Sequence, residues 1–380
     1  MGAILNGMVD SMKKLLFLIP SLGGGGAERV LANLVNNLDR EKYDITVQTL
    51  FDIGINRQHL QEHITYIPGF PWQVPGNTKL LKLRSPKALY QQLIKKQYDV
   101  VISYLEGPTA RIVAGCPYPD TKLICWIHVE QHTKEIASYS FRSYEEAHEC
   151  YACYHEIVCV AESVKKDFEA IFDLPKPVRV LYNTNETDQI LERGAEQVTD
   201  LVLSDEVNIF SVGRLRHEKG YDRLIRAHRI LLDRGLKHHI YILGEGDEKE
   251  KFLQLIAENK VEDTFHLLGF RENPYKYVAK ADLFVCSSRR EGFSTAVTEA
   301  LILGVPVVST LCSGARELLG ENDEYGIVTE NSEEGVTWGL QRMLTEPGML
   351  EHYREKARER GPFFSKEASV RAVEKMLDSL

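Results

Sequence analysis

The chain has 380 residues, of which 43% are hydrophobic and 27% charged, and its formal net charge is −9. This length predicts two domains, and the composition is that of a globular protein with enough apolar residues for two cores. The negative charge falls entirely on residues 186–380, which argues against a nucleic-acid-binding protein. The seven cysteines are irregularly spaced, so we expect reduced thiols and a cytoplasmic location rather than a disulfide framework.

The first half of the chain alternates apolar strands with amphipathic helices. Leu15–Ile19 is predicted to be a buried strand, and Ala27–Leu38 is the helix that follows it. Further strands are expected at 45–50, 64–67, 100–104, 123–127, 156–160 and 178–181, and helices at 86–96, 141–154 and 163–171. Such alternation predicts a parallel sheet covered by helices.

A run of glycines separates the first predicted strand from the first helix. Glycine lets the backbone approach a ligand, and a helix start can hold an anion, so Gly25 is a candidate contact for a phosphate or an acceptor. A plain tight turn is the alternative. The dinucleotide fingerprint fails, because Glu28 or Arg29 stands where its third glycine is required. This disfavours a nicotinamide-dependent enzyme.

Residues 79–96 form a basic segment without any acidic residue. Ser85 and Pro86 are predicted to start a helix within it, and leucines are interleaved with the cations. A cationic amphipathic segment can lie on an anionic membrane or meet an acceptor, and a solvated helix face is the alternative. The cations are Lys79, Lys82, Arg84, Lys87, Lys95 and Lys96.

His128 directly follows the predicted strand at 123–127. Ligands bind at the carboxyl ends of parallel strands, so this histidine is expected to face a cleft and contact a sugar. A structural histidine is the alternative reading. The polar stretch 183–204 is the predicted link between the two domains.

The second half repeats the alternation of strands and helices. Strands are predicted at 207–212, 240–243, 265–267, 283–286 and 305–309, with helices at 221–234, 248–258, 274–279 and 295–303. Gly213, Arg214 and Lys219 follow the first of these strands, in an arrangement that suits a phosphate. The next two strand ends carry Gly244, Gly246, Phe270 and Arg271, which could line a nucleotide site or form ordinary turns.

The stretch 284–310 places Glu291 on a strand-end loop and Glu299 about one turn into the next helix. Ser294 is a predicted cap for that helix, and the free N–H groups of 292–296 suit a phosphate or sugar hydroxyls. Carboxylates beside an anion-binding helix start suggest a sugar nucleotide. Asp-x-Asp is absent from the chain, so Arg214 and not a metal is expected to help neutralise the diphosphate.

Three motifs together resemble the retaining, GT-B-fold glycosyltransferases of family 4 over nearly the whole chain. They are Glu291-x7-Glu299, Gly213-Arg-Leu-x-x-Glu-Lys-Gly220, and Gly24-Gly-x-Ala-Glu28. The resemblance implies an α/β protein with two Rossmann-like domains facing a central cleft and a C-terminal helix that crosses back to the first domain. The expected boundaries are 12–182 plus 363–380 for the acceptor-side domain, 183–204 for the linker and 205–362 for the nucleotide-sugar domain.

The resemblance also implies roles for individual residues. Arg214 and Lys219 would neutralise the diphosphate, Glu299 would hold the ribose, and Glu291 and His128 would lie at the donor sugar. Further donor contacts are implied for Gly25, Gly213, Gly244, Gly246, Phe270, Arg271, Gly292, Phe293, Ser294 and Thr295. Many members carry Gly-Leu where this chain has Ser294-Thr295, so the sugar is left open.

The expected activity is a metal-independent, cofactor-free and retaining transfer of a hexosyl or N-acetylhexosaminyl group. The donor would be a nucleotide sugar, taken as UDP-linked, and the acceptor a saccharide in cell-surface polysaccharide synthesis. The basic segment suggests that this acceptor is lipid-linked and that the protein meets the inner face of the membrane peripherally. A GT-B-fold UDP-sugar epimerase and a non-catalytic UDP-sugar-binding protein are the alternatives.

Overall fold

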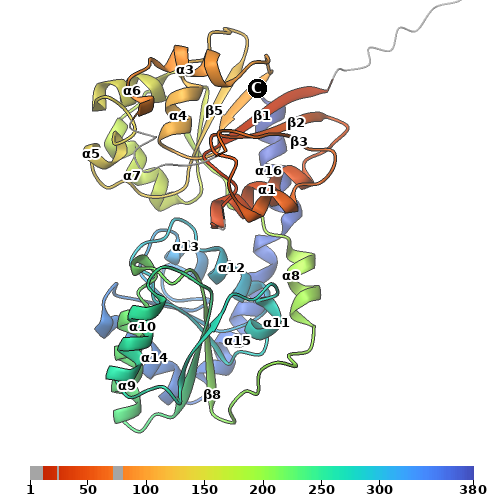
Figure 1. The fold of residues 1–380 in the computed structure, drawn as a ribbon. Helices are drawn as coiled ribbons and strands as arrows, with labels where there is room; N and C mark the ends of the chain where they lie inside the picture. The colour runs from red at the N-terminus through yellow and green to blue at the C-terminus, as the bar shows by residue number, and fades with distance from the viewer. Residues whose placement is uncertain (1–11, 24, 72–79) are drawn as a thin grey trace, which may run out of the picture. The chain divides into compact units, whose positions relative to one another are not determined.

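The computed structural model describes residues 12–23, 25–71 and 80–380, which form two compact α/β units (Figure 1). The N-terminal unit contains the chain up to Cys159, residues 167–179 and residues 373–380. The C-terminal unit contains residues 160–166 and 180–372. Two helices, α7 (Glu162–Phe172) and α16 (Lys366–Asp378), therefore contribute residues to both units.

The N-terminal unit has a seven-stranded sheet in the order β3-β2-β1-β4-β5-β6-β7. Strand β1 (Lys13–Ile19) pairs in parallel with β2 (Tyr43–Thr49) and with β4 (Val100–Ser103). The remaining strands are β3 (Thr65–Ile67), β5 (Lys122–Ile127), β6 (Glu156–Cys159) and β7 (Val178–Val180). In the part of the chain that the structure describes, the helices given before α7 are α1 (Gly26–Asn37), η1 (Ile55–His59), α3 (Pro86–Leu93), α4 (Pro108–Val113), α5 (Lys134–Ala137) and α6 (Tyr144–Ala152).

The C-terminal unit has a six-stranded sheet in the order β10-β9-β8-β11-β12-β13. Its strands are β8 (Val207–Val212), β9 (His238–Leu243), β10 (Phe265–Gly269), β11 (Leu283–Cys286), β12 (Val307–Thr310) and β13 (Ile327–Thr329). Its helices before α16 are α8 (Thr187–Gly194), η2 (His217–Lys219), α9 (Tyr221–Asp233), α10 (Lys249–Glu258), α11 (Tyr275–Val278), α12 (Thr295–Ile302), α13 (Ala315–Leu319), α14 (Glu333–Thr345), α15 (Met349–Arg360) and η3 (Gly361–Phe364).

Helices cover both faces of the C-terminal sheet. Figure 1 shows α9, α10 and α14 on one side of β8, and α8, α11, α12 and α15 on the other. Strands buried on both faces require continuous apolar sequence. The run Leu283–Cys286 of β11 meets this requirement, because all four of its residues are buried.

The structure confirms the predicted alternation and the two parallel sheets. It also confirms the C-terminal helix that returns to the first domain, because Lys13 Nζ donates to the Leu377 carbonyl at 2.7 Å and Tyr43 donates to Asp378 at 2.5 Å. The stretch 183–204 differs from the expected linker. It contains α8 and belongs to the C-terminal unit, where α8 packs on α11 and α12.

The basic segment also differs from its prediction, although Ser85 caps α3 and Pro86 starts it as expected. The helix ends at Leu93, and Leu89, Tyr90 and Ile94 are buried in the core. Because the core uses these apolar residues, α3 is not an amphipathic helix with a free apolar face. Lys79 lies outside the described residues.

Candidate active site

The predicted strand-end loops of the C-terminal unit come together at one place in its sheet. The chain leaves β8 in one direction for β9, and β11 lies on the other side of β8, so the strand order reverses there. Open α/β sheets bind ligands at such a switch point, outside the carboxyl ends of the strands. The loop 213–220 after β8 and the loop 287–294 after β11 flank this position.

Lys219 and Glu291 form an ion pair between these two loops. Lys219 Nζ lies 2.7 Å from Glu291 Oε1, and the Ser288 hydroxyl donates to the same oxygen. Burial lowers the pKa of Lys219, but the Glu291 carboxylate more than offsets this and raises the pKa above its usual value. Lys219 therefore stays positively charged throughout the physiological pH range.

The pair borders a cavity of only about 10 Å³, which has room for about one water molecule. Ser294 and the buried Tyr221 also line it. A substrate must therefore bind outside this cavity or displace the side chains that fill it. The site therefore contains a cation and a carboxylate that hold each other in place.

Two arginines hold the β11 loop against α9. Arg223 is buried and donates to the carbonyls of Ser287 and Ser288. Arg289 binds Asp222 with both Nη atoms, at 2.6 and 2.8 Å. Burial raises the pKa of Asp222, but hydrogen bonds from Arg289 and Arg226 lower it well below its usual value. These contacts fix the loop that carries Glu291.

The glycines at the strand ends allow these loops to pack backbone against backbone. A Cβ atom on Gly244 would lie 2.0 Å from the Gly213 carbonyl oxygen, and one on Gly246 would lie 2.4 Å from the Leu215 carbonyl oxygen. Gly244 has a φ of 146°, which L side chains rarely adopt. A Cβ on Gly213 would clash with the Tyr221 hydroxyl, at 2.7 Å. These predicted donor contacts thus have a clear packing role.

The start of α12 matches its prediction. The Ser294 hydroxyl accepts a hydrogen bond from the Val297 N–H, which confirms Ser294 as the cap, and Thr295 is the first helical residue. Phe293 is buried, and Gly292 precedes it on the loop. The helix start therefore points its first N–H groups out of the carboxyl edge of the sheet, where an anion is stabilised.

Glu299 lies one turn into α12 and is half-buried. The Tyr275 hydroxyl in α11 donates to Glu299 Oε1 at 3.3 Å, and the Arg193 guanidinium lies over the Tyr275 ring. Sequence reasoning missed Tyr275, as it missed Ser288 and Arg223. Ser288 follows a predicted strand, which was an available signal, but no sequence pattern connects Tyr275 or Arg223 to the carboxylates.

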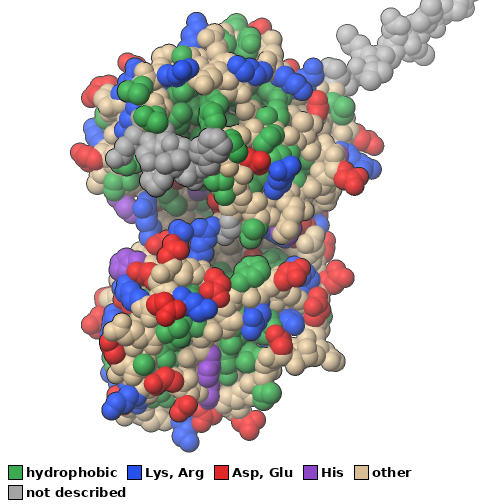
Figure 2. Space-filling view, in the orientation of Figure 1, with side chains coloured by type: hydrophobic (Ala, Val, Ile, Leu, Met, Phe, Trp, Pro, Cys, Tyr) green, Lys and Arg blue, Asp and Glu red, His purple; other side chains and the backbone are tan. Residues whose placement is uncertain are grey.

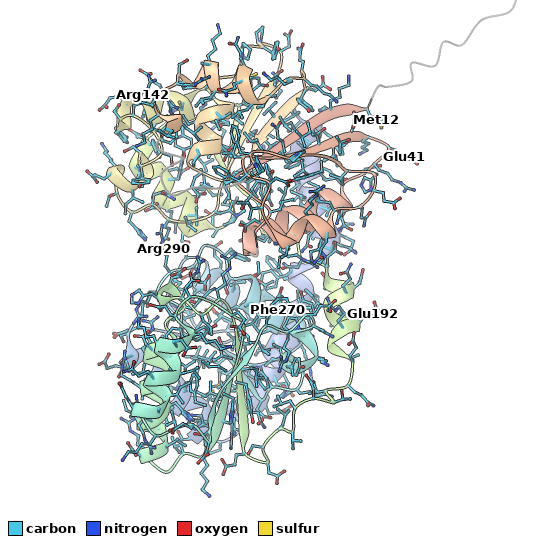
Figure 3. The ribbon with its side chains drawn as sticks, in the orientation of Figure 1. Met12, Glu41, Arg142, Glu192, Phe270 and Arg290 are labelled. Carbon is cyan, nitrogen blue, oxygen red and sulfur yellow. The ribbon has the colours of Figure 1, made fainter. Side chains whose placement is uncertain are left out.

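The other predicted residues of this unit lie around the same edge of the sheet. Arg214 is half-buried in the β8 loop. Phe270 is 63% exposed after β10, and Figure 3 labels it together with Arg290 of the β11 loop, at the same end of the sheet. The Arg271 guanidinium lies 3.7 Å from Asp200, so this side chain is directed to an ion pair within the unit.

Gly25 and His128 belong to the N-terminal unit. Gly25 is the residue before α1, and a Cβ there would lie 2.1 Å from a carboxylate oxygen of Glu28. His128 is 6% exposed, and burial lowers its pKa to about 4, so it is neutral at physiological pH. Its backbone N–H donates to Glu106, and its Nε2 atom is buried without a hydrogen-bond partner among the described residues.

Comparisons with known proteins identify the class of the chain. The family model "Glycosyl transferases group 1" matches residues 196–360, and "Glycosyltransferase Family 4" matches residues 24–189. Anabaena HepE in complex with UDP and glucose superposes with a TM-score of 0.77 at 18% identity, covering 97% of this chain and 100% of that one. Sucrose-phosphate synthase from Thermosynechococcus elongatus gives 0.77 at 14% identity, with 97% and 99% covered. The fold is that of GT-B glycosyltransferases.

A characterised relative is similar to nearly the whole chain. The N-acetylgalactosamine-N,N'-diacetylbacillosaminyl-diphospho-undecaprenol 4-alpha-N-acetylgalactosaminyltransferase of Campylobacter jejuni is 33% identical over 379 residues, which cover 96% of this chain and 100% of the relative. An uncharacterised glycosyltransferase of Haemophilus influenzae is 25% identical over 351 residues, with 91% and 95% covered. The chain therefore belongs to the group 1 glycosyltransferases of family 4, as the sequence motifs predicted.

Proposed function

We propose that this glycosyltransferase moves a hexosyl or N-acetylhexosaminyl group from a UDP-sugar to a saccharide carried on a lipid diphosphate, in cell-surface polysaccharide synthesis. The observation that carries this proposal is the Lys219–Glu291 pair at the switch point of the C-terminal sheet. Support for the substrates comes from the Campylobacter jejuni relative, whose name gives an undecaprenyl diphosphate-linked acceptor. The UDP bound to the HepE structure supports the choice of nucleotide.

The donor diphosphate would lie at the helix start of α12, with Arg214 and Lys219 neutralising its charge. As the bond between the anomeric carbon and the diphosphate oxygen breaks, negative charge grows on the leaving group. A cation that is already in place stabilises this charge without reorganisation. Because the chain lacks Asp-x-Asp, we propose that these groups act without a metal ion.

We further propose that the anomeric configuration is retained. The acceptor hydroxyl oxygen would attack the anomeric carbon from the face that the diphosphate leaves, and the departing diphosphate would take the hydroxyl proton. Glu291 would bind hydroxyls of the donor sugar. Neutral His128 would offer Nε2 to a sugar hydroxyl, which would give a partner to a buried atom that has none among the described residues.

The test is an incubation with UDP-glucose, UDP-galactose and their N-acetylamino counterparts, with and without an undecaprenyl diphosphate-linked disaccharide. Mass spectrometry should find the acceptor one sugar heavier with one of these donors, and NMR should show an α linkage. Donor conversion in the absence of acceptor would instead identify an epimerase. Nucleotide binding without any product would identify a binding protein.

Replacing Glu299 by alanine is expected to weaken UDP binding about 10- to 100-fold, because a carboxylate that accepts ribose hydroxyls is lost. Isothermal titration calorimetry measures this. The matched variant Tyr275→Phe removes only the hydroxyl that holds Glu299, so it should weaken binding by a smaller factor. An unchanged UDP affinity in Glu299→Ala would contradict the ribose contact.

A lipid-linked acceptor requires access to the membrane. Among the described residues, no helix has the length and apolar character needed to cross a bilayer. We propose peripheral contact at the inner face of the membrane through the basic segment. There, Leu80 and Leu83 are 61% and 77% exposed beside Lys82 and Arg84. Figure 2 shows lysine and arginine side chains along the edge of the unit that carries α3.

Changing Lys82, Lys87 and Lys95 to glutamate is expected to lower the fraction of protein bound to anionic liposomes, since each cation near an anionic surface contributes about 1 kcal/mol. Co-sedimentation at low salt measures this fraction. The triple variant of Lys237, Lys251 and Lys280, which are exposed in the C-terminal unit, makes the same change in charge and should bind as the wild type does. An equal loss of liposome binding in both triple variants would show that binding depends only on the net charge of the protein and not on the basic segment.

A further inference from the structure

A larger pocket lies in the C-terminal unit, outside the cavity that Lys219 and Glu291 border. Its volume is about 480 Å³, within the range of small-molecule sites. Its walls come from the ends of β12 and β13, from α13 and from the first turns of α14. The residues that matter for its chemistry are Leu311, Arg316, Glu330, Glu334, Gly335 and Trp338.

Trp338 gives this pocket an aromatic wall. Its side chain is 50% exposed, although it lies in a helix whose neighbours Val336 and Leu340 are buried. The Arg342 guanidinium lies 5.0 Å from the centre of the indole ring and is itself paired with Glu346. The ring is therefore held in position while half of it remains open to a ligand. An ordered, exposed indole is well suited to pack against an apolar face.

The polar groups of the pocket select the kind of ligand. Glu330 and Glu334 are exposed acceptors, and Arg316 contributes a guanidinium with one nitrogen already donating to the Glu321 carbonyl. Two carboxylates against one cation disfavour phosphates, nucleotides and acidic lipids. A purely apolar ligand would leave these groups unpaired. A neutral ring with hydroxyls on its edge and C–H groups on its face satisfies both the indole and the carboxylates.

The pocket is built from tightly joined segments. A Cβ on Gly335 would lie 2.2 Å from the Glu330 carbonyl oxygen, so glycine permits the first turn of α14 to approach this loop. Asn331 Nδ2 donates to the carbonyls of Leu311, at 3.2 Å, and of Arg289, at 2.9 Å. The same side chain thus ties a wall of the pocket to the loop that carries Glu291. The pocket is a fixed neighbour of the candidate active site.

We infer that this pocket is a carbohydrate-binding subsite that holds a neutral saccharide ring against Trp338, with hydroxyls bound by Glu330, Glu334 and Arg316. Its ligand class follows from its own side chains and does not depend on the donor or on catalysis. In a transferase that extends saccharides, such a subsite would retain sugars of the chain other than the one that reacts.

The test measures binding of a short α-linked N-acetylgalactosamine trisaccharide in the presence of saturating UDP, by calorimetry and saturation-transfer NMR. Trp338→Ala is expected to weaken binding at least about tenfold, whereas Trp338→Tyr keeps an aromatic face and should lose less. Lys219→Ala should bind the trisaccharide as the wild type does. Because no turnover is measured, this result is independent of the proposed reaction.

Four outcomes would overturn the inference. Equal affinities of the wild type and Trp338→Ala, or no binding by the wild type at millimolar trisaccharide, would show that the pocket takes no saccharide. Loss of binding in Lys219→Ala would place the trisaccharide in the donor site. A lower molecular mass of Trp338→Ala in analytical ultracentrifugation would mean that the pocket is filled by a second copy of the chain. A thermal melt of each variant verifies that it is folded.

Discussion

Replacing Lys219 by alanine is expected to lower the rate of sugar transfer about 100-fold or more, which is typical when a preorganised stabiliser of transition-state charge is lost. The side chain is held 2.7 Å from Glu291 and keeps its charge, so it meets the growing charge of the leaving diphosphate without moving into place. The rate is measured under saturating donor, so that weaker binding does not contribute.

The control for this experiment is Lys237→Ala, which removes an equal charge from a side chain that is 79% exposed in the same unit. Its turnover should equal that of the wild type. Near-native turnover of Lys219→Ala would remove this lysine from the reaction. Glu291→Gln makes a useful second variant, because the loss of its charge should lower the pKa of Lys219 while leaving the side chain in place.

Replacing Arg111 by methionine is expected to destabilise the N-terminal unit by about 3–5 kcal/mol, the cost of breaking a buried ion pair from one side. Arg111 is 1% exposed and binds both carboxylate oxygens of Glu146, at 2.8 and 3.0 Å. It also donates to the carbonyls of Leu81 and Arg84, so it holds the turn that precedes α3. The turn would lose its anchor together with the pair.

Scanning calorimetry should show the corresponding transition lowered by roughly 10 °C for a unit of this size. Arg142→Met is the matched control. Arg142, labelled in Figure 3, lies 4.0 Å from the same carboxylate but is 48% exposed, so its pair is worth at most about 1 kcal/mol. Similar melting curves for the two variants would show that the buried Arg111 pair stabilises the unit no more than the exposed Arg142 pair does.

The sequence was sufficient to predict the two sheets. It also predicted that the candidate active site lies at the carboxyl ends of the strands in the C-terminal sheet. Apolar runs mark buried parallel strands, and strand ends must lie at one edge, so Lys219 and Glu291 could be brought together although 72 positions separate them. The prediction of an amphipathic segment at 79–96 holds only in part, because periodicity shows that a segment has an apolar side but not whether the core covers it. Leu89 and Ile94 are covered, whereas Leu83 is not.

The residues that hold the candidate active site in place could not be predicted from the sequence, for a different reason. Arg223 and Tyr275 act through contacts with the Ser287 carbonyl and the Glu299 carboxylate, and these depend on how α9 and α11 pack against the β11 loop and α12. Packing of this kind is decided by the whole unit. The pocket at Trp338 also depends on the packing of the whole unit, because its walls come from four separate elements.

The return of α16 to the N-terminal unit has a consequence for biosynthesis. Lys13 and Tyr43 donate hydrogen bonds to Leu377 and Asp378. The N-terminal sheet, which leaves the ribosome first, therefore lacks these contacts until residues 373–380 have been synthesised. At ordinary elongation rates, the delay after residue 179 is roughly 10–40 s. During that interval the C-terminal unit is being synthesised, and the nascent N-terminal sheet depends on its other contacts or on chaperones.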